Sequence, residues 1–206
     1  MNATLGHTSQ GAPVLRSDLA FIANWIGQGT RVLDLGCGDG SLLRYLAAAK
    51  SVHGYGVEID DQKVIASVRN GVNVLQQDLE EGLALFGDDA FDTVVQLETL
   101  QAMKNVEGIL REIARVGREA IISFPNFGYW QHRTSLLMGR MPVSESLPYE
   151  WYDTPNVRCA TIRDFEVLAS KVGLEILDRV ALHHGRPITF MPNLFGSLAV
   201  FRCRKA

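Results

Sequence analysis

The sequence contains little cysteine. Only Cys37, Cys159 and Cys203 occur among 206 residues. An odd number at such wide spacing provides neither a disulfide framework nor a paired-cysteine metal site. We therefore expect a reducing compartment and no metal centre.

Long apolar runs are also missing. No segment approaches the roughly 18 apolar residues of a membrane-spanning helix, and residues 1–13 lack the basic-then-apolar order of a secretory signal. These features predict a cytoplasmic protein without a membrane partner. Residues 1–13 are expected to form a flexible arm, and residues 14–206 a single domain.

An excess of basic residues is absent as well. Twenty Lys and Arg residues face 23 Asp and Glu residues, a formal charge of −3. This balance disfavours a nucleic-acid partner and favours small molecules or proteins. With 47% hydrophobic and 21% charged residues, the chain is expected to fold into a globular core. Its oligomeric state stays open, with a homodimer among the options.

Strand-like and helix-like segments alternate along the first 124 residues. This order predicts an α/β protein with a parallel sheet between two helical layers, because parallel strands need crossover connections. The segments are a helix over 15–26, a strand over 32–35, a helix over 41–49, a strand over 54–60, a helix over 62–70, strands over 72–76 and 91–97, a helix over 106–116 and a strand over 120–124.

An aromatic-rich insertion interrupts this order at about 125–160. Residues 124–152 contain seven aromatic side chains, and prolines recur at 125, 142, 148 and 155. The alternation resumes at Thr161 and Asp164, which are spaced as in a capping box. Segments 174–182 and 197–203 lack a helix between them and are expected to form an antiparallel pair that closes the sheet edge.

A glycine-rich turn follows the first predicted strand. Gly36, Gly38 and Gly40 alternate with other residues, whereas a dinucleotide-binding loop needs the spacing GxGxxG, which Ser41 breaks. The turn instead resembles motif I of class I S-adenosylmethionine-dependent methyltransferases. Such a loop lets the backbone approach a ligand next to the amides of a helix N-terminus.

Two acidic residues follow at the separations typical of that superfamily. Glu58 ends the second strand and matches the carboxylate that binds the ribose hydroxyls, and Asp78 follows the third strand and matches the acid near adenine. The resemblance therefore implies S-adenosylmethionine or S-adenosylhomocysteine as a nucleoside ligand. The implied binding residues are Asp34, Gly36, Cys37, Gly38, Gly40, Glu58, Ile59, Asp78, Leu79 and Gln96.

Some of these residues have simpler interpretations. Asp34 either holds the loop amides or is merely half-exposed at a strand end. Cys37 is expected to be a small residue that lines the loop, because no nearby cation would lower the pKa of its thiol.

A methyl-acceptor site is not evident. Residues 96–101 lack the Asn/Asp-Pro-Pro-aromatic turn of enzymes that methylate planar nitrogens. The catalytic residues remain unknown, with Glu98 and His132 as weak candidates. Glu98 is a base, a contact for the cationic ligand or a plain helix-start acid. His132 is either a base or an ordinary hydrogen-bonded or exposed histidine, and His183 and His184 are further options.

The aromatic residues of the insertion also have two interpretations. Tyr129, Trp130, Tyr149, Trp151 and Tyr152 either cover a substrate pocket or form a protein-binding patch.

Three longer runs extend the resemblance to a particular family. Together with residues 34–40 and 57–60, they resemble the methionine biosynthesis protein MetW family over residues 15–204. The runs are Phe124-Pro125-Asn126-Phe127-Gly128-Tyr129-Trp130, Pro148-Tyr149-Glu150-Trp151-Tyr152-Asp153-Thr154-Pro155-Asn156 and Cys159-Ala160-Thr161-Ile162-Arg163-Asp164-Phe165.

The family resemblance implies a Rossmann-like, class I methyltransferase-like three-layer sandwich. Its mostly parallel, seven-stranded sheet would have an antiparallel last strand. It further implies a partner and activator of homoserine O-acyltransferase in methionine synthesis. The alternatives are an S-adenosylmethionine-dependent small-molecule O- or N-methyltransferase and a scaffold without a ligand.

Overall fold

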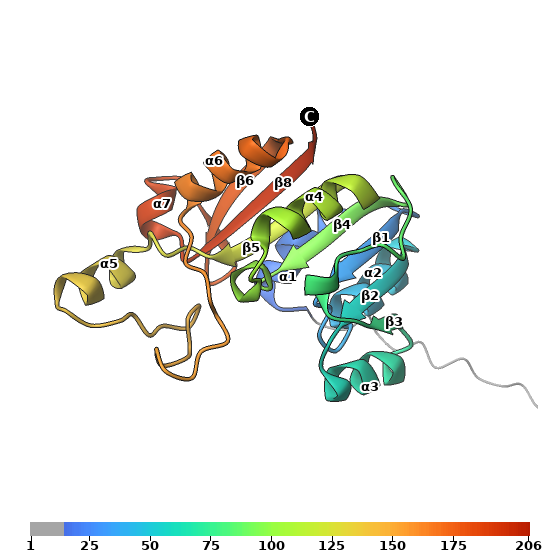
Figure 1. Ribbon diagram of the computed structural model, residues 1–206, viewed down its shortest axis with the longest axis horizontal. Coiled ribbons are helices and arrows are strands. Elements are labelled where there is room, and N and C mark those ends of the chain that lie inside the picture. The colour runs from blue at the N-terminus through green and yellow to red at the C-terminus, as the bar shows by residue number, and fades with distance from the viewer. Residues whose placement is uncertain (1–14) are drawn as a thin grey trace, which may run out of the picture.

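A mostly parallel sheet forms the centre of the molecule. The computed structural model describes residues 15–206, so the expected arm at 1–13 lies outside the described residues. Eight strands lie in the order β3-β2-β1-β4-β5-β8-β6-β7 (Figure 1). The strands are β1 (Arg31–Leu35), β2 (His53–Glu58), β3 (Asn73–Gln76), β4 (Phe91–Leu97), β5 (Gly117–Pro125), β6 (Leu174–His183), β7 (Arg186–Ile188) and β8 (Leu198–Lys205).

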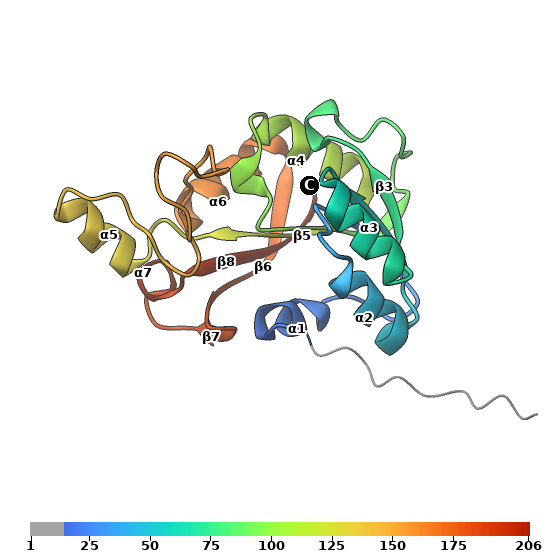
Figure 2. The same ribbon diagram turned by 90° about the horizontal axis from the view of Figure 1, so that it is seen from below.

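Helices connect the strands and cover both faces of the sheet, as the alternating pattern predicts. Figure 2 shows α1 and α2 on one side of the sheet and α4 and α6 on the other. The helices are α1 (Ser17–Ala23), α2 (Ser41–Lys50), α3 (Asp61–Arg69), α4 (Val106–Val116), α5 (Trp130–Leu137), α6 (Ile162–Val172) and α7 (Pro192–Phe195), with 3₁₀ turns η1 (Leu79–Glu81) and η2 (Leu100–Ala102).

The core has two halves because strand side chains alternate between the faces. On β1, Val32 packs in the half formed with α1 and α2, whereas Leu33 and Leu35 pack in the half formed with α4 and α6. The predicted capping box starts α6, where Thr161 and Asp164 bond reciprocally. Strands β1 to β5 run in parallel, so their carboxyl ends lie at one edge of the sheet. Ligands bind at this edge in open α/β sheets.

The last strands run antiparallel, as expected. Strand β6 pairs with β8, and β8 also pairs with β5. The pair closes this end of the sheet, with β8 between β5 and β6 and the short β7 beyond β6. The short strand β7 adds an eighth strand to the expected seven and forms a hairpin with β6 through His184 and Gly185.

The insertion between β5 and α6 projects from the body. It consists of α5 and a long loop, and its two ends meet in a bridge between Asn126 and Ala160 (Figures 1 and 2). Within residues 15–206, no helix is long and apolar enough to cross a membrane.

Candidate functional site

The three glycines of the loop after β1 all take left-handed backbone conformations. The φ angles are 77° at Gly36, 60° at Gly38 and 72° at Gly40, values that side chains disfavour. A Cβ atom at Gly36 would collide with Thr99, and one at Gly40 would lie 2.8 Å from a Val72 methyl carbon. A Cβ atom at Gly38 would meet no atom within 4 Å, so this glycine exposes the loop backbone to open space.

The carboxylate of Glu58 faces this loop. Its Oε2 accepts a hydrogen bond from the Gly38 amide at 2.9 Å. Its Oε1 accepts hydrogen bonds from the amides of Ile59 at 2.9 Å and Asp60 at 3.0 Å. The side chain is buried, and Oε2 keeps capacity for a second donor. The Glu58 carboxylate thus joins the loop to the end of β2.

Asp34 is a buried carboxyl group beside this pair. It accepts no hydrogen bond from the part of the chain that the structure describes, and burial together with the charge of Glu58 raises its pKa to about 7. Cys37 turns away toward α3, where its sulfur lies 3.8 Å from Ser67 Oγ, and burial raises the pKa of the thiol to about 12. The thiol is therefore protonated at neutral pH, which disfavours a nucleophilic role.

The other predicted ligand residues lie at the carboxyl ends of β2, β3 and β4. Ile59 is 59% exposed, whereas Leu79 is buried in the core. Asp78 is exposed and caps η1 through a 2.9 Å bond from the Glu80 amide. Gln96 is fully buried, and neither its amide nitrogen nor its oxygen has a partner among the described residues. Orphaned polar groups at Asp34 and Gln96 fit a polar ligand at this edge.

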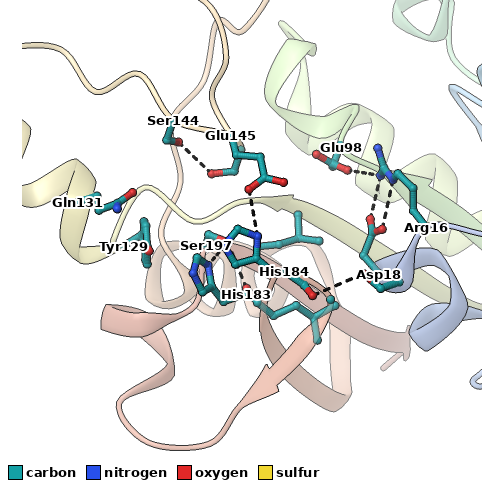
Figure 3. Close-up of a pocket in the computed structure, with 15 residues that line it drawn as sticks. Arg16, Asp18, Glu98, Tyr129, Gln131, Ser144, Glu145, His183, His184 and Ser197 are labelled. Carbon is teal, nitrogen blue, oxygen red and sulfur yellow. Dashed lines mark hydrogen bonds and ion pairs between the residues drawn. The ribbon is translucent and has the colours of Figure 1, made fainter.

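A cavity of about 590 Å³ lies beyond the end of β4 (Figure 3). On one side, Nη2 of Arg16 contacts Asp18 at 2.8 Å and Glu98 at 2.7 Å. On the other side, Glu145 of the insertion lies 3.1 Å from His184 of the β6–β7 hairpin. Segments from both ends of the chain and from the insertion therefore form one site.

The catalytic candidate Glu98 lines this cavity, as do His183 and His184. His183 Nδ1 contacts Ser197 Oγ at 3.1 Å. Burial lowers the pKa of His183, as does His184, whereas the charge of Glu145 opposes the shift.

His132 does not line the cavity directly. It is fully buried, with Nδ1 3.2 Å from the Asn126 carbonyl and Nε2 2.8 Å from Ser144 Oγ. Because a carbonyl only accepts, Nδ1 carries the proton and Nε2 accepts from Ser144. Burial lowers the pKa of His132. This histidine therefore holds Ser144, which does line the cavity.

The aromatic residues of the insertion separate into two groups. Tyr129 is buried and lines the cavity. The other four side chains are exposed on the projecting segment: Trp130 (42%), Tyr149 (47%), Trp151 (70%) and Tyr152 (71%).

Sequence reasoning missed Arg16, Asp18 and Glu145 as members of the site. Charged residues near a helix start or in a loop carry no distinguishing signal, and the long-range contacts that join them appear only in the fold. The positive φ angles of Glu98 (50°) and His184 (48°) are likewise invisible in the sequence.

Comparison with solved structures defines the class of the fold. A methyltransferase from Mesorhizobium loti has a TM-score of 0.70 at 15% identity, with 92% of this chain and 98% of that chain covered. A possible histamine N-methyltransferase from Thermotoga maritima has a TM-score of 0.66 at 19% identity, with 92% and 88% covered. The [4+2]-cyclase SpnF has a TM-score of 0.66 at 20% identity, with 92% and 80% covered. The chain thus has the class I methyltransferase-like fold, a fold that does not by itself fix the reaction.

The family is narrower than the fold. The family described as "Methionine biosynthesis protein MetW" matches residues 16–203, and the chain belongs to this family. A "Bifunctional methionine biosynthesis protein MetXA/MetW" from Rhodopirellula baltica is 39% identical over an alignment of 176 residues, and the match covers 81% of this chain. This chain spans only 28% of that relative's length.

Proposed function

We propose that this protein is a partner subunit that activates homoserine O-acyltransferase and binds S-adenosylmethionine or S-adenosylhomocysteine. The observation that carries the partner role is the projecting insertion with four exposed aromatic residues. Large aromatic side chains dominate the binding energy of protein interfaces, and exposed clusters of them mark interaction sites.

The bifunctional relative supports the identity of the partner. Its name joins a MetXA part and a MetW part in one polypeptide, and we take the MetXA part to be the acyltransferase. Two functions fused in one protein are held at high effective concentration. Separate chains achieve the same association through an interface, and the insertion supplies a surface for it.

The nucleoside ligand is supported by the loop after β1. Gly36 to Gly40 would approach it with the backbone, Glu58 Oε2 would accept from a sugar hydroxyl, and Ile59 would cover an apolar face. The buried Asp34 and Gln96 would gain hydrogen-bond partners. When bound, S-adenosylmethionine supplies an electrophilic methyl group. A regulatory role requires that this ligand binds, but it does not require transfer of the methyl group.

Two binding experiments test the proposal separately. The full-length protein and homoserine O-acyltransferase are mixed and passed over a size-exclusion column, and a shared peak is expected. Titration calorimetry with S-adenosylhomocysteine should give binding that is lost in Glu58→Ala. Separate elution excludes the partner role, and the absence of heat with the wild type excludes the nucleoside ligand.

The cavity beside Glu98 favours a second candidate function, a small-molecule methyltransferase. It places carboxylates and imidazoles beyond the end of β4, where a general base would be needed. Transfer of a labelled methyl group from S-adenosylmethionine to a pathway metabolite would favour this function. A partner subunit without its own reaction would transfer none.

A further inference from the structure

The cavity of Figure 3 has an unequal distribution of charge. Its lining contains one guanidinium group, on Arg16, and three carboxylates, on Asp18, Glu98 and Glu145. The three carboxylates outnumber the single guanidinium, and this distribution attracts a cation. The volume of about 590 Å³ falls in the range of small-molecule sites.

Arg16 retains one free donor group within this acidic cavity. Its Nε and Nη2 bond to Asp18, and Nη2 also bonds to Glu98. Its Nη1 has no partner among residues 15–206. Charged N–H groups form strong hydrogen bonds to carboxylates. The site therefore presents the Nη1 donor for a carboxylate next to an acceptor, Glu98, for an ammonium group.

Two strained backbone conformations occur among the residues that line the cavity. Glu98 and His184 both have φ angles near 50° although neither is glycine, and both line the cavity. Such strained conformations cluster at ligand sites. The amide of Glu98 is held by the Ser123 carbonyl at 3.0 Å and Ser123 Oγ at 3.2 Å, which keeps the carboxylate beside Arg16.

One wall of the cavity belongs to the insertion. Ser144, Glu145 and Ser146 form this wall, and Ser144 is held by the buried His132. The wall contacts the β6–β7 hairpin through Glu145 and His184, two exposed groups. A ligand that fills the space between the wall and Glu98 would thus restrain the insertion.

We propose that this cavity binds a small zwitterionic amino acid, with its ammonium group on Glu98 and its carboxylate on Nη1 of Arg16. Binding holds the 144–146 wall against the core. The inference goes beyond the proposed function, because it requires neither the nucleoside ligand nor the protein partner.

The test is calorimetric titration of the full chain with L-homoserine and L-methionine. At least one should bind, and Glu98→Gln and Arg16→Gln should each weaken binding about tenfold or more, since each removes a charged hydrogen-bond partner. Glu175→Gln is the matched control, because Glu175 pairs with Arg204 on a strand edge outside the cavity. N-acetyl-L-methionine and L-methioninol, which lack the ammonium group and the carboxylate respectively, should bind at least tenfold more weakly than L-methionine.

A second measurement separates the cavity from the nucleoside site. Hydrogen exchange of residues 140–150 should slow when the amino acid binds, in the wild type and in Glu58→Ala alike. Binding that is absent for both amino acids, insensitive to Glu98→Gln and Arg16→Gln, or lost when S-adenosylhomocysteine is added would overturn the proposal.

Discussion

At the residue scale, the buried position of Asp34 makes its ionised carboxylate costly for folding stability. Its folded-state pKa of about 7 lies above the unfolded value near 3.9. The native state therefore binds more protons than the unfolded state between these values, and the contribution of Asp34 to stability falls as pH rises through this window. We expect Asp34→Asn to raise the melting temperature by about 2 °C or more at pH 8, with little gain at pH 4. An equal change at both pH values would contradict this assignment.

The contribution of His132 to folding stability changes with pH in the opposite direction. Burial lowers its pKa below 6.5, so the unfolded state binds the proton more readily. Its stabilising contribution is present above about pH 6.5 and is lost as pH falls, because protonation removes the acceptor at Nε2 from Ser144. Melting curves at pH 8 and pH 5.5 should show that acidification destabilises the wild type more than His132→Gln. Parallel losses in the two proteins would exclude this role.

At the element scale, two substitutions in the glycine loop distinguish effects on stability from effects on ligand binding. Gly40→Ala should destabilise the fold by about 1–3 kcal/mol, because it combines a left-handed residue with a contact on Val72. Gly38→Ala adds a methyl group to open space and should cost about 1 kcal/mol. It should nevertheless weaken S-adenosylhomocysteine binding about tenfold or more, since the methyl group occupies the approach to the loop backbone. Thermal melts measure the effect on stability, and calorimetry measures the effect on binding. Unchanged affinity in Gly38→Ala would argue against a ligand site at this loop.

The insertion is the second element with a testable role. Trp151→Ala should weaken binding to homoserine O-acyltransferase by about 2 kcal/mol, roughly thirtyfold in Kd, if this exposed tryptophan anchors the interface. Leu85→Ala is the matched control, because Leu85 is 71% exposed but lies in the segment between η1 and β4. Biolayer interferometry measures both affinities. Equal affinity in the two variants would place the interface elsewhere.

Most of the fold was predictable because its signals are local. The strand and helix alternation, the antiparallel pairing of β6 with β8 and the capping box at Thr161 follow from periodicity and turn chemistry. The insertion of β8 between β5 and β6 and the short strand β7 were not predicted, because strand order depends on long-range pairing. Likewise, the loop after β1 was located from the sequence, whereas the contact between Arg16 and Glu98 arises only when distant segments meet.

At the scale of the whole molecule, three features lie along one edge of the sheet. The glycine loop and Glu58 lie at the ends of β1 and β2, the acidic cavity lies beyond β4, and the exposed aromatic residues lie on the insertion that follows β5. The wall at residues 144–146 connects the cavity to the insertion. A small molecule can regulate a partner only if it binds two states of the complex differently, and this arrangement provides such a connection.

We propose above that this chain activates homoserine O-acyltransferase through the insertion. This is tested by the rate of homoserine acylation by the purified acyltransferase alone, with the wild-type protein and with Trp151→Ala. We expect a severalfold higher rate with the wild type and little increase with Trp151→Ala at the same concentration. A rate that the wild-type protein leaves unchanged at a saturating concentration would contradict it.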